Sequence, residues 1–193
     1  MITRWAAAGS AAAGTLGAAG LAMAVAGSAP WRYVSESGVP GAPHAGLYQL
    51  SMVLLAVSLA LLAVSAHRAV AACFLLAAPL AAVSGAVHCS PGCPLPPYET
   101  PSPRDLLHAT AAIGALGFCA LAMLLYSTLR LPALLRRAGR IGLLVAYPPL
   151  ILSAAGILFA GRSLFTGVME RIALVGVSAW VVFMAALHAR SRP

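Results

Sequence analysis

The chain has 193 residues, of which 61% are hydrophobic and only 8% are charged. A water-soluble domain carries about a quarter charged residues, so this composition, with a mean hydropathy of +0.92, excludes a water-soluble fold. The formal net charge is +8, but no basic aromatic patch and no nucleic-acid-binding motif accompanies it. We therefore expect no nucleic-acid partner, and we explain the charge by its position along the chain.

Six stretches are long and apolar enough to cross a bilayer, for which a helix needs about 20 residues. They cover approximately residues 5–28, 47–66, 69–88, 105–129, 141–160 and 168–188. No Asp or Glu lies in the central part of any of them. The sequence therefore predicts an all-α polytopic membrane protein, a single six-span bundle over residues 1–193.

The first stretch, 5–28, has two interpretations. Its Ala- and Gly-rich run, which ends in AVAGSA, resembles a cleaved secretory signal. The run is long for a signal core, and an uncleaved span keeps the number of spans even, so we expect it to be retained. Gly14, Gly17 and Gly20 recur every three residues and predict a packing face made of small residues.

The connecting segments have the composition of loops. Residues 29–46 are rich in Pro, Gly and Ser, and residues 89–104 contain six prolines, which favours turns over helix. Residues 130–140 form a short basic connector. The link at 66–68 is so short that the second and third spans must form an antiparallel hairpin.

The orientation follows from the tendency of arginines to remain on the cytoplasmic side. With the N-terminus inside, the inner segments hold eight arginines, which are Arg4, Arg68, Arg130, Arg136, Arg137, Arg140, Arg190 and Arg192. The outer segments hold the other four arginines and all four acidic residues, which are Arg32, Arg104, Arg162, Arg171, Glu36, Glu99, Asp105 and Glu170. The inner face then carries the whole net charge, which anionic lipid head groups attract. We expect both termini in the cytoplasm, a location in the cell membrane, and membrane lipids as partners.

Polar side chains gather at the predicted outer ends of the spans, where they would form a basin at the membrane surface. Ionisable groups beside membrane spans are candidates for function. The candidate catalytic residues are His44, Asp105, His108 and Glu170, and the candidate ligand-binding residues are His88, Arg104 and Arg171.

Asp105 has two interpretations. Ser102 and Pro103 precede it in the pattern of a helix N-terminus, with a Ser cap, a Pro at the first position and an acidic residue at the third. Asp105 therefore either caps the helix or orients His108, three residues on and on the same helical face. An oriented imidazole can transfer protons or bind a metal.

Cys89 and Cys93 flank a Ser-Pro-Gly turn on the predicted oxidising face. We expect a disulfide between them, as is usual outside the cytoplasm. The alternative is a soft metal site formed by His88, Cys89, Cys93 and His108, since Cys and His suit copper or zinc. The spacing matches no established metal pattern, so no metal or other cofactor is expected.

Several short motifs follow one another along the chain. They are Gly38-Val39-Pro40 with His44, Ser84-Gly85, Cys89 and Cys93 with Pro94, Asp105-x-x-His108, and Gly167-x-x-Glu170-Arg171-Ile172. Over residues 8–188, this order resembles the family of bacterial and archaeal integral membrane proteins known as domain of unknown function 998. The resemblance implies a six-helix bundle with a polar outer cluster and no agreed activity.

Three functional classes remain open. The first is a non-enzymatic membrane protein whose outer basin recognises a lipid, a small molecule or a partner membrane protein, and this is the function we expect. The second is an intramembrane lipid hydrolase or transferase that uses the outer His and Asp residues. The third is a metal- or redox-handling protein that uses Cys89 and Cys93. The common motifs of hydrolases, nucleotide-binding proteins and metalloproteases are absent from the sequence.

Overall fold

The computed structural model describes residues 2–190, and over this range its secondary structure consists of helices joined by loops, without a strand. The elements are α1 (Ile2–Val25), the 3-10 helix η1 (Val34–Gly38), α2 (Ala45–Ala63), α3 (Arg68–Ala86), α4 (Pro103–Thr128), α5 (Ala133–Ala160) and α6 (Leu164–Arg190). All six α-helices are long and apolar enough to cross a membrane. The predicted all-α bundle with six spans is therefore confirmed.

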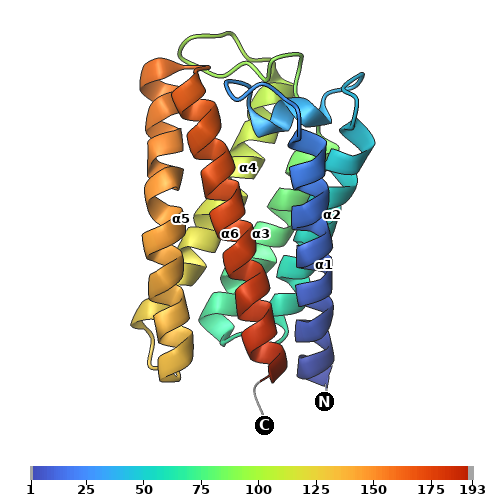
Figure 1. The fold of residues 1–193 in the computed structure, drawn as a ribbon. Coiled ribbons are helices and arrows are strands. Elements are labelled where there is room, and N and C mark those ends of the chain that lie inside the picture. Colours follow the sequence, from blue (N-terminus) through green and yellow to red (C-terminus); the bar gives the residue numbers. More distant parts are fainter. Residues whose placement is uncertain (1, 191–193) are drawn as a thin grey trace.

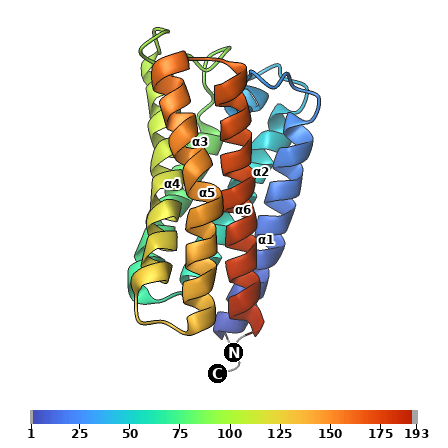
Figure 2. The same ribbon diagram turned by 60° about the vertical axis from the view of Figure 1, so that its left-hand side comes forward.

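The six long helices form a closed ring. Each packs against its neighbours in the sequence, and α6 packs against α1 (Figures 1 and 2). Both termini lie at one end of the bundle, which we call the terminal end (Figure 1). The segments 26–44, 87–102 and 161–163 lie at the opposite end, which we call the loop end.

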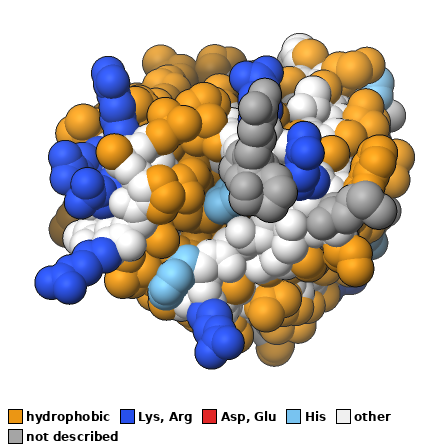
Figure 3. Space-filling view, turned by 90° about the horizontal axis from the view of Figure 1, so that it is seen from below, with side chains coloured by type: hydrophobic (Ala, Val, Ile, Leu, Met, Phe, Trp, Pro, Cys, Tyr) orange, Lys and Arg blue, Asp and Glu red, His pale blue; other side chains and the backbone are white. Residues whose placement is uncertain are grey.

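The charges divide between the two ends as the sequence predicts. Figure 3 views the terminal end and shows Arg and His side chains on it, with no acidic side chain visible among the described residues. All four acidic residues belong to segments of the loop end, to the first turn of α4 or to the second turn of α6. Arg192 lies outside the described residues. The side of the membrane that each end faces remains a prediction.

The fifth helix is longer than predicted. It begins at Ala133, so residues 133–140, expected to be a connector, form its first two turns. Pro132 directly precedes the helix, and Arg is a good helix former, so nothing in this segment opposes a helix. Its arginines extend from the end of a span toward water, where long basic side chains are accommodated.

Small residues bring α1 and α2 close together, as Gly14, Gly17 and Gly20 predicted. The Ser10 hydroxyl donates to the Ser58 carbonyl at 2.8 Å, and the Ser58 hydroxyl donates to the Ser10 carbonyl at 2.9 Å. A Cβ atom added to Gly14 would lie 2.7 Å from the Ser58 Oγ. The interface therefore combines glycine contacts with reciprocal hydrogen bonds, both of which suit helices packed in lipid.

Aromatic side chains fill the terminal half of the ring. The rings of Phe74, Tyr126 and Trp180 lie with centroids 5.9–6.5 Å apart. The Tyr126 hydroxyl is 2.9 Å from His188 Nε2, and the Trp180 indole donates to the Ala138 carbonyl at 3.0 Å. This half of the bundle is densely packed, whereas the loop-end half is hollow.

Candidate ligand cavity at the loop end

The loop-end half of the ring encloses a cavity of about 510 Å³. This lies within the range of about 300–1,000 Å³ that is usual for small-molecule sites. All six α-helices contribute to its wall, together with η1 and the segment that follows α3. Most of the wall consists of Ala, Leu, Ile and Val side chains, so the cavity suits an apolar ligand.

The cavity opens sideways between α4 and α5. Six of its lining residues are exposed on the surface of the bundle, and all six belong to these two helices. They are Ile113, Gly117, Tyr147, Ile151, Ala154 and Leu158. The lining residues from every other element are buried or half-buried. The opening therefore faces the region that the hydrocarbon of a bilayer would occupy.

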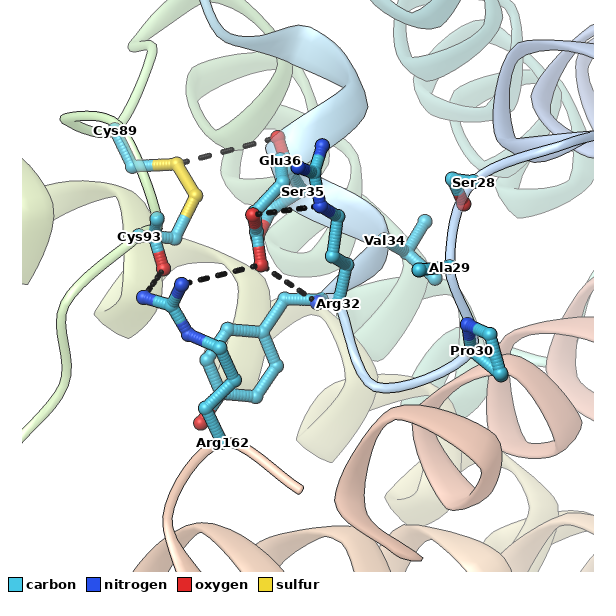
Figure 4. A network of polar contacts seen from close by, with 12 residues as sticks. Ser28, Ala29, Pro30, Arg32, Val34, Ser35, Glu36, Cys89, Cys93 and Arg162 are labelled. Carbon is cyan, nitrogen blue, oxygen red and sulfur yellow. Dashed lines mark hydrogen bonds and ion pairs between the residues drawn. A yellow bond between two sulfur atoms is a disulfide. The ribbon is translucent and has the colours of Figure 1, made fainter. Parts of the chain in front are cut away.

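Arg162 joins three segments at the loop end (Figure 4). Its Nη2 donates to Glu99 Oε1 at 3.0 Å and to the Gly92 carbonyl, and its Nη1 lies 4.0 Å from Glu36 Oε1. Its guanidinium carbon lies 5.9 Å from the centroid of the Tyr33 ring. One side chain thus joins the α5–α6 turn to the loops before α2 and before α4.

Tyr33 lies beneath this network and lines the cavity. Burial raises the pKa of its phenol to about 12, and the Glu170 and Glu99 carboxylates add to the shift. The hydroxyl therefore stays protonated at physiological pH and gives the cavity a neutral polar group.

Arg171 fixes the loop before η1 to α6. Its Nη1 donates to the carbonyl oxygens of Pro30 at 3.0 Å and Arg32 at 2.7 Å, and its Nη2 donates to Ser28 Oγ and the Ala29 carbonyl. The guanidinium is thereby directed at the loop, and Arg171 does not line the cavity.

Gly167 and Glu170 complete this attachment. A Cβ atom at Gly167 would collide with the carbonyl oxygens of Pro30 and Arg32, so only glycine lets the loop lie on α6. Glu170 Oε2 accepts a hydrogen bond from the Val34 backbone at 2.9 Å. The motif Gly-x-x-Glu-Arg thus attaches the loop before η1 to α6.

Glu170 also faces the cavity. It is half-buried and lines the wall, and its Oε1 has no hydrogen-bond partner among the described residues. Tyr48 lines the same wall, is only 4% exposed, and its hydroxyl has no partner within the described chain. His108 is buried at the wall, with Nδ1 2.8 Å from the Val87 carbonyl. These groups give an apolar cavity a small polar end.

Asp105 acts as a helix cap and as a tie between loops. Its Oδ2 accepts hydrogen bonds from the Ser102 backbone and hydroxyl at 2.8 and 2.6 Å, and its Oδ1 accepts one from the Ser90 backbone at 2.6 Å. The capping box expected from the sequence is present. Asp105 makes no hydrogen bond to His108 in the described structure, so the two do not form the dyad considered above.

The structure brings together some of the predicted site residues and separates others. Asp105, His108 and Glu170 all line the cavity. The remaining candidates, His44, His88, Arg104 and Arg171, do not line it. His44 is exposed before α2 and borders a smaller hollow of about 230 Å³, whereas His88 lies 3.3 Å from the Gln49 side chain.

Cys89 and Cys93 lie at disulfide distance, with Cα atoms 5.0 Å apart. Within residues 2–190, no group of three or more His, Cys, Asp or Glu side chains is arranged to hold a metal ion. The set of His88, Cys89, Cys93 and His108 therefore does not converge on one point.

Two lining positions of the cavity were missed from the sequence. Tyr33 and Tyr48 belong to its wall, but neither was singled out. Arg162 was placed among the outer charged residues without being named as a binding or catalytic candidate. A tyrosine in the first turn of an apolar span was an available signal for Tyr48. The direction in which a side chain points depends on how the helices pack, which the sequence pattern does not specify.

A family model described as "Protein of unknown function (DUF998)" matches residues 28–187. The match covers α2 to α6 with the loop end, and it begins after α1, so it is shorter than the range 8–188 that the resemblance covered. No curated protein and no solved structure matches the chain significantly.

Proposed function

Because the chain belongs to the DUF998 family, whose description assigns no activity, we propose a function from the cavity itself: the protein binds a lipid-like amphiphile without changing it chemically. The ligand enters sideways from the bilayer between α4 and α5. Its chain lies along the apolar wall, and its head group lies beside Glu170, His108 and Tyr48.

The observation that carries this proposal is the position of the opening. All six exposed lining residues are on α4 and α5, where the surface of the bundle faces lipid if the six helices span a membrane. At the loop end, Arg162 and Arg171 tie down the connecting segments. A ligand that partitions into the bilayer therefore has a direct route, whereas a water-soluble one would have to pass between segments that Arg162 and Arg171 hold together.

The alternative of a lipid hydrolase or transferase has less support. It needs a carboxylate that orients His108, and His108 hydrogen-bonds neither Asp105 nor Glu170 in the described structure, because its Nδ1 faces the Val87 carbonyl. A redox function of Cys89 and Cys93 has support only from their proximity. With the orientation predicted from the arginines, the cavity lies in the outer leaflet of the cell membrane.

The test uses the full chain, purified in detergent, and an environment-sensitive fluorescent amphiphile. Ser178 is buried in the cavity wall, and the adjacent Ala179 is exposed on the surface of α6. We expect Ser178→Phe to weaken binding at least tenfold and Ala179→Phe to leave it unchanged. Ala154 lies at the exposed opening between α4 and α5, so Ala154→Phe would narrow the opening without burying a large side chain in the core. It should also weaken binding.

Size-exclusion profiles and thermal unfolding establish that each variant is folded. Equal affinities in all three variants would contradict the proposal, as would a wild-type protein that binds no amphiphile and co-purifies with no lipid detectable by mass spectrometry.

A further inference from the structure

The charged residues that line the cavity are acidic. Two acidic residues line the wall, Asp105 and Glu170, and no arginine is among the described lining residues. Asp105 already accepts four hydrogen bonds from Ser90 and Ser102. Glu170 is therefore the one acidic lining residue with an oxygen left for a ligand.

The arginines nearby are directed elsewhere. Arg171 donates from both Nη atoms to the segment 28–32 and to the Gly167 carbonyl. Arg162 donates from Nη2 to Gly92 and Glu99 in the loop before α4, and it does not line the cavity, although its buried Nε has no partner within the described residues. A phosphate or carboxylate head group would find no cation in the cavity wall, and it would lie beside the Glu170 carboxylate in a medium of low dielectric constant, where like charges repel strongly.

His108 and Tyr48 can accept hydrogen bonds from a ligand that carries a donor group. The Nδ1 of His108 faces the Val87 carbonyl, so in the neutral ring Nδ1 carries the proton and Nε2 is an acceptor. Tyr48 lines the same wall, and no hydrogen bond of its hydroxyl is present within residues 2–190, so the hydroxyl is open to a ligand.

We propose, on the basis of the function proposed above, that the ligand carries a positively charged amine. Its ammonium group lies beside Glu170 Oε1, with the Tyr48 hydroxyl as a further partner and His108 as an additional acceptor elsewhere on the same wall. Its apolar chain extends toward the opening between α4 and α5. The same chemistry occurs in a free hydrophobic amine and in a lipid with an amine head group, and the experiment distinguishes the two.

The probes are a saturated long-chain primary amine, the alcohol and the fatty acid of equal chain length, each used to displace the fluorescent amphiphile near pH 7.5. At this pH the amine is protonated and the acid ionised. We expect wild-type protein to bind the amine at least tenfold more tightly than the alcohol, and the fatty acid most weakly.

Glu170→Gln should abolish the preference for the amine and leave the affinity for the alcohol unchanged. This variant keeps an oxygen that can accept from the Val34 backbone, so the loop stays attached. Glu99→Gln is the matched control, because it removes the same charge from a half-buried residue that does not line the cavity and keeps an oxygen that can accept from Arg162. It should retain the preference. Tyr48→Phe, which removes the hydroxyl alone, should lower the affinity for the amine severalfold.

A second arm reconstitutes the protein in nanodiscs of phosphatidylcholine with and without phosphatidylethanolamine and measures the lipids retained after extraction into detergent. If wild-type protein retains phosphatidylethanolamine and the Glu170→Gln variant does not, the ligand is a lipid with an amine head group. If wild-type protein retains no phosphatidylethanolamine but binds the long-chain amine tightly, the ligand is a free amine. Fatty acid binding equal to amine binding would overturn this inference and leave the cavity proposal intact. Failure of all three probes to bind would instead contradict the proposed function.

Discussion

Arg171 on α6 donates a 2.7 Å hydrogen bond to the backbone carbonyl of Arg32, which lies in the loop before η1. The same guanidinium contacts three more residues of this loop, Ser28, Ala29 and Pro30. The loop leads directly into the residues that cover the cavity, Tyr33 and Val34. A charged side chain thus positions the cover of an apolar cavity without lining it.

We predict that Arg171→Ala lowers the stability of the folded protein by roughly 2–3 kcal/mol, the range expected when hydrogen bonds from a charged donor are lost. Thermal unfolding in detergent measures the change, and limited proteolysis should show faster cleavage within residues 26–44. Arg104→Ala is the matched control, because Arg104 is exposed and no hydrogen bond or ion pair of its side chain is present in the described structure. A similar loss of stability in both variants would show that the loop contacts contribute nothing.

A larger side chain at Gly167 would test the close contact between α6 and the loop before η1. We predict that Gly167→Ala destabilises the protein by about 1–3 kcal/mol, the usual cost of overpacking, because its Cβ atom would collide with the Pro30 and Arg32 carbonyls. A Cβ atom at Gly117, within α4, would meet nothing within 4 Å. Gly117→Ala should therefore be neutral or stabilising by up to about 1 kcal/mol through helix propensity. The midpoints of thermal unfolding compare the two, and equal shifts would be evidence against close contact at Gly167.

The Ser10 and Ser58 hydroxyls also lie 3.1 Å from each other, so the two side chains give a measurable coupling between α1 and α2. We predict that Ser10→Ala and Ser58→Ala each destabilise the protein and that the double variant costs less than their sum. The coupling should be about 0.6–1.7 kcal/mol, the range found for polar pairs in membranes. A double-mutant cycle in a denaturing detergent measures it. Thr15→Ala is the control, since the Thr15 hydroxyl bonds only the Ala11 carbonyl of its own helix, and strict additivity at Ser10 and Ser58 would contradict the prediction.

The disulfide between Cys89 and Cys93 can be tested by thiol labelling of denatured protein. We predict that two thiols react without a reductant, those of Cys73 and Cys119, and that all four react after reduction. The Cys89→Ser/Cys93→Ser double variant should give two reactive thiols under both conditions. Labelling of four thiols before reduction would show that the pair is not bonded, despite its close approach.

The fold could be predicted from the sequence because its main determinants are local. Six apolar stretches specify six spans, and Ser102 and Asp105 form the cap that their spacing predicted. The start of α5 was misplaced because arginines mark the end of the hydrocarbon region and do not end a helix. Glycines at positions 14, 17 and 20 could be assigned to a packing face because their spacing alone defines one.

The site was predicted only in part, because it depends on contacts between segments distant in the sequence. Glu170 and His108 were identified by residue type, but their union at one cavity requires the closed ring of helices. Arg171 was expected to bind a ligand, and instead its donors are used by a loop about 140 residues away in the sequence. The opening between α4 and α5 follows from packing alone, and no motif marks it.

The orientation predicted from the arginines can be tested by fusing reporters to the chain. The structure places both termini at one end, so they must lie on the same side of any membrane that all six helices cross. We predict that a green fluorescent protein fused to the C-terminus is fluorescent and that alkaline phosphatase fused there is inactive. Alkaline phosphatase inserted between Pro97 and Tyr98, in the loop before α4, should be active, because it would lie outside. The opposite pattern would place the cavity in the inner leaflet and reverse the predicted orientation.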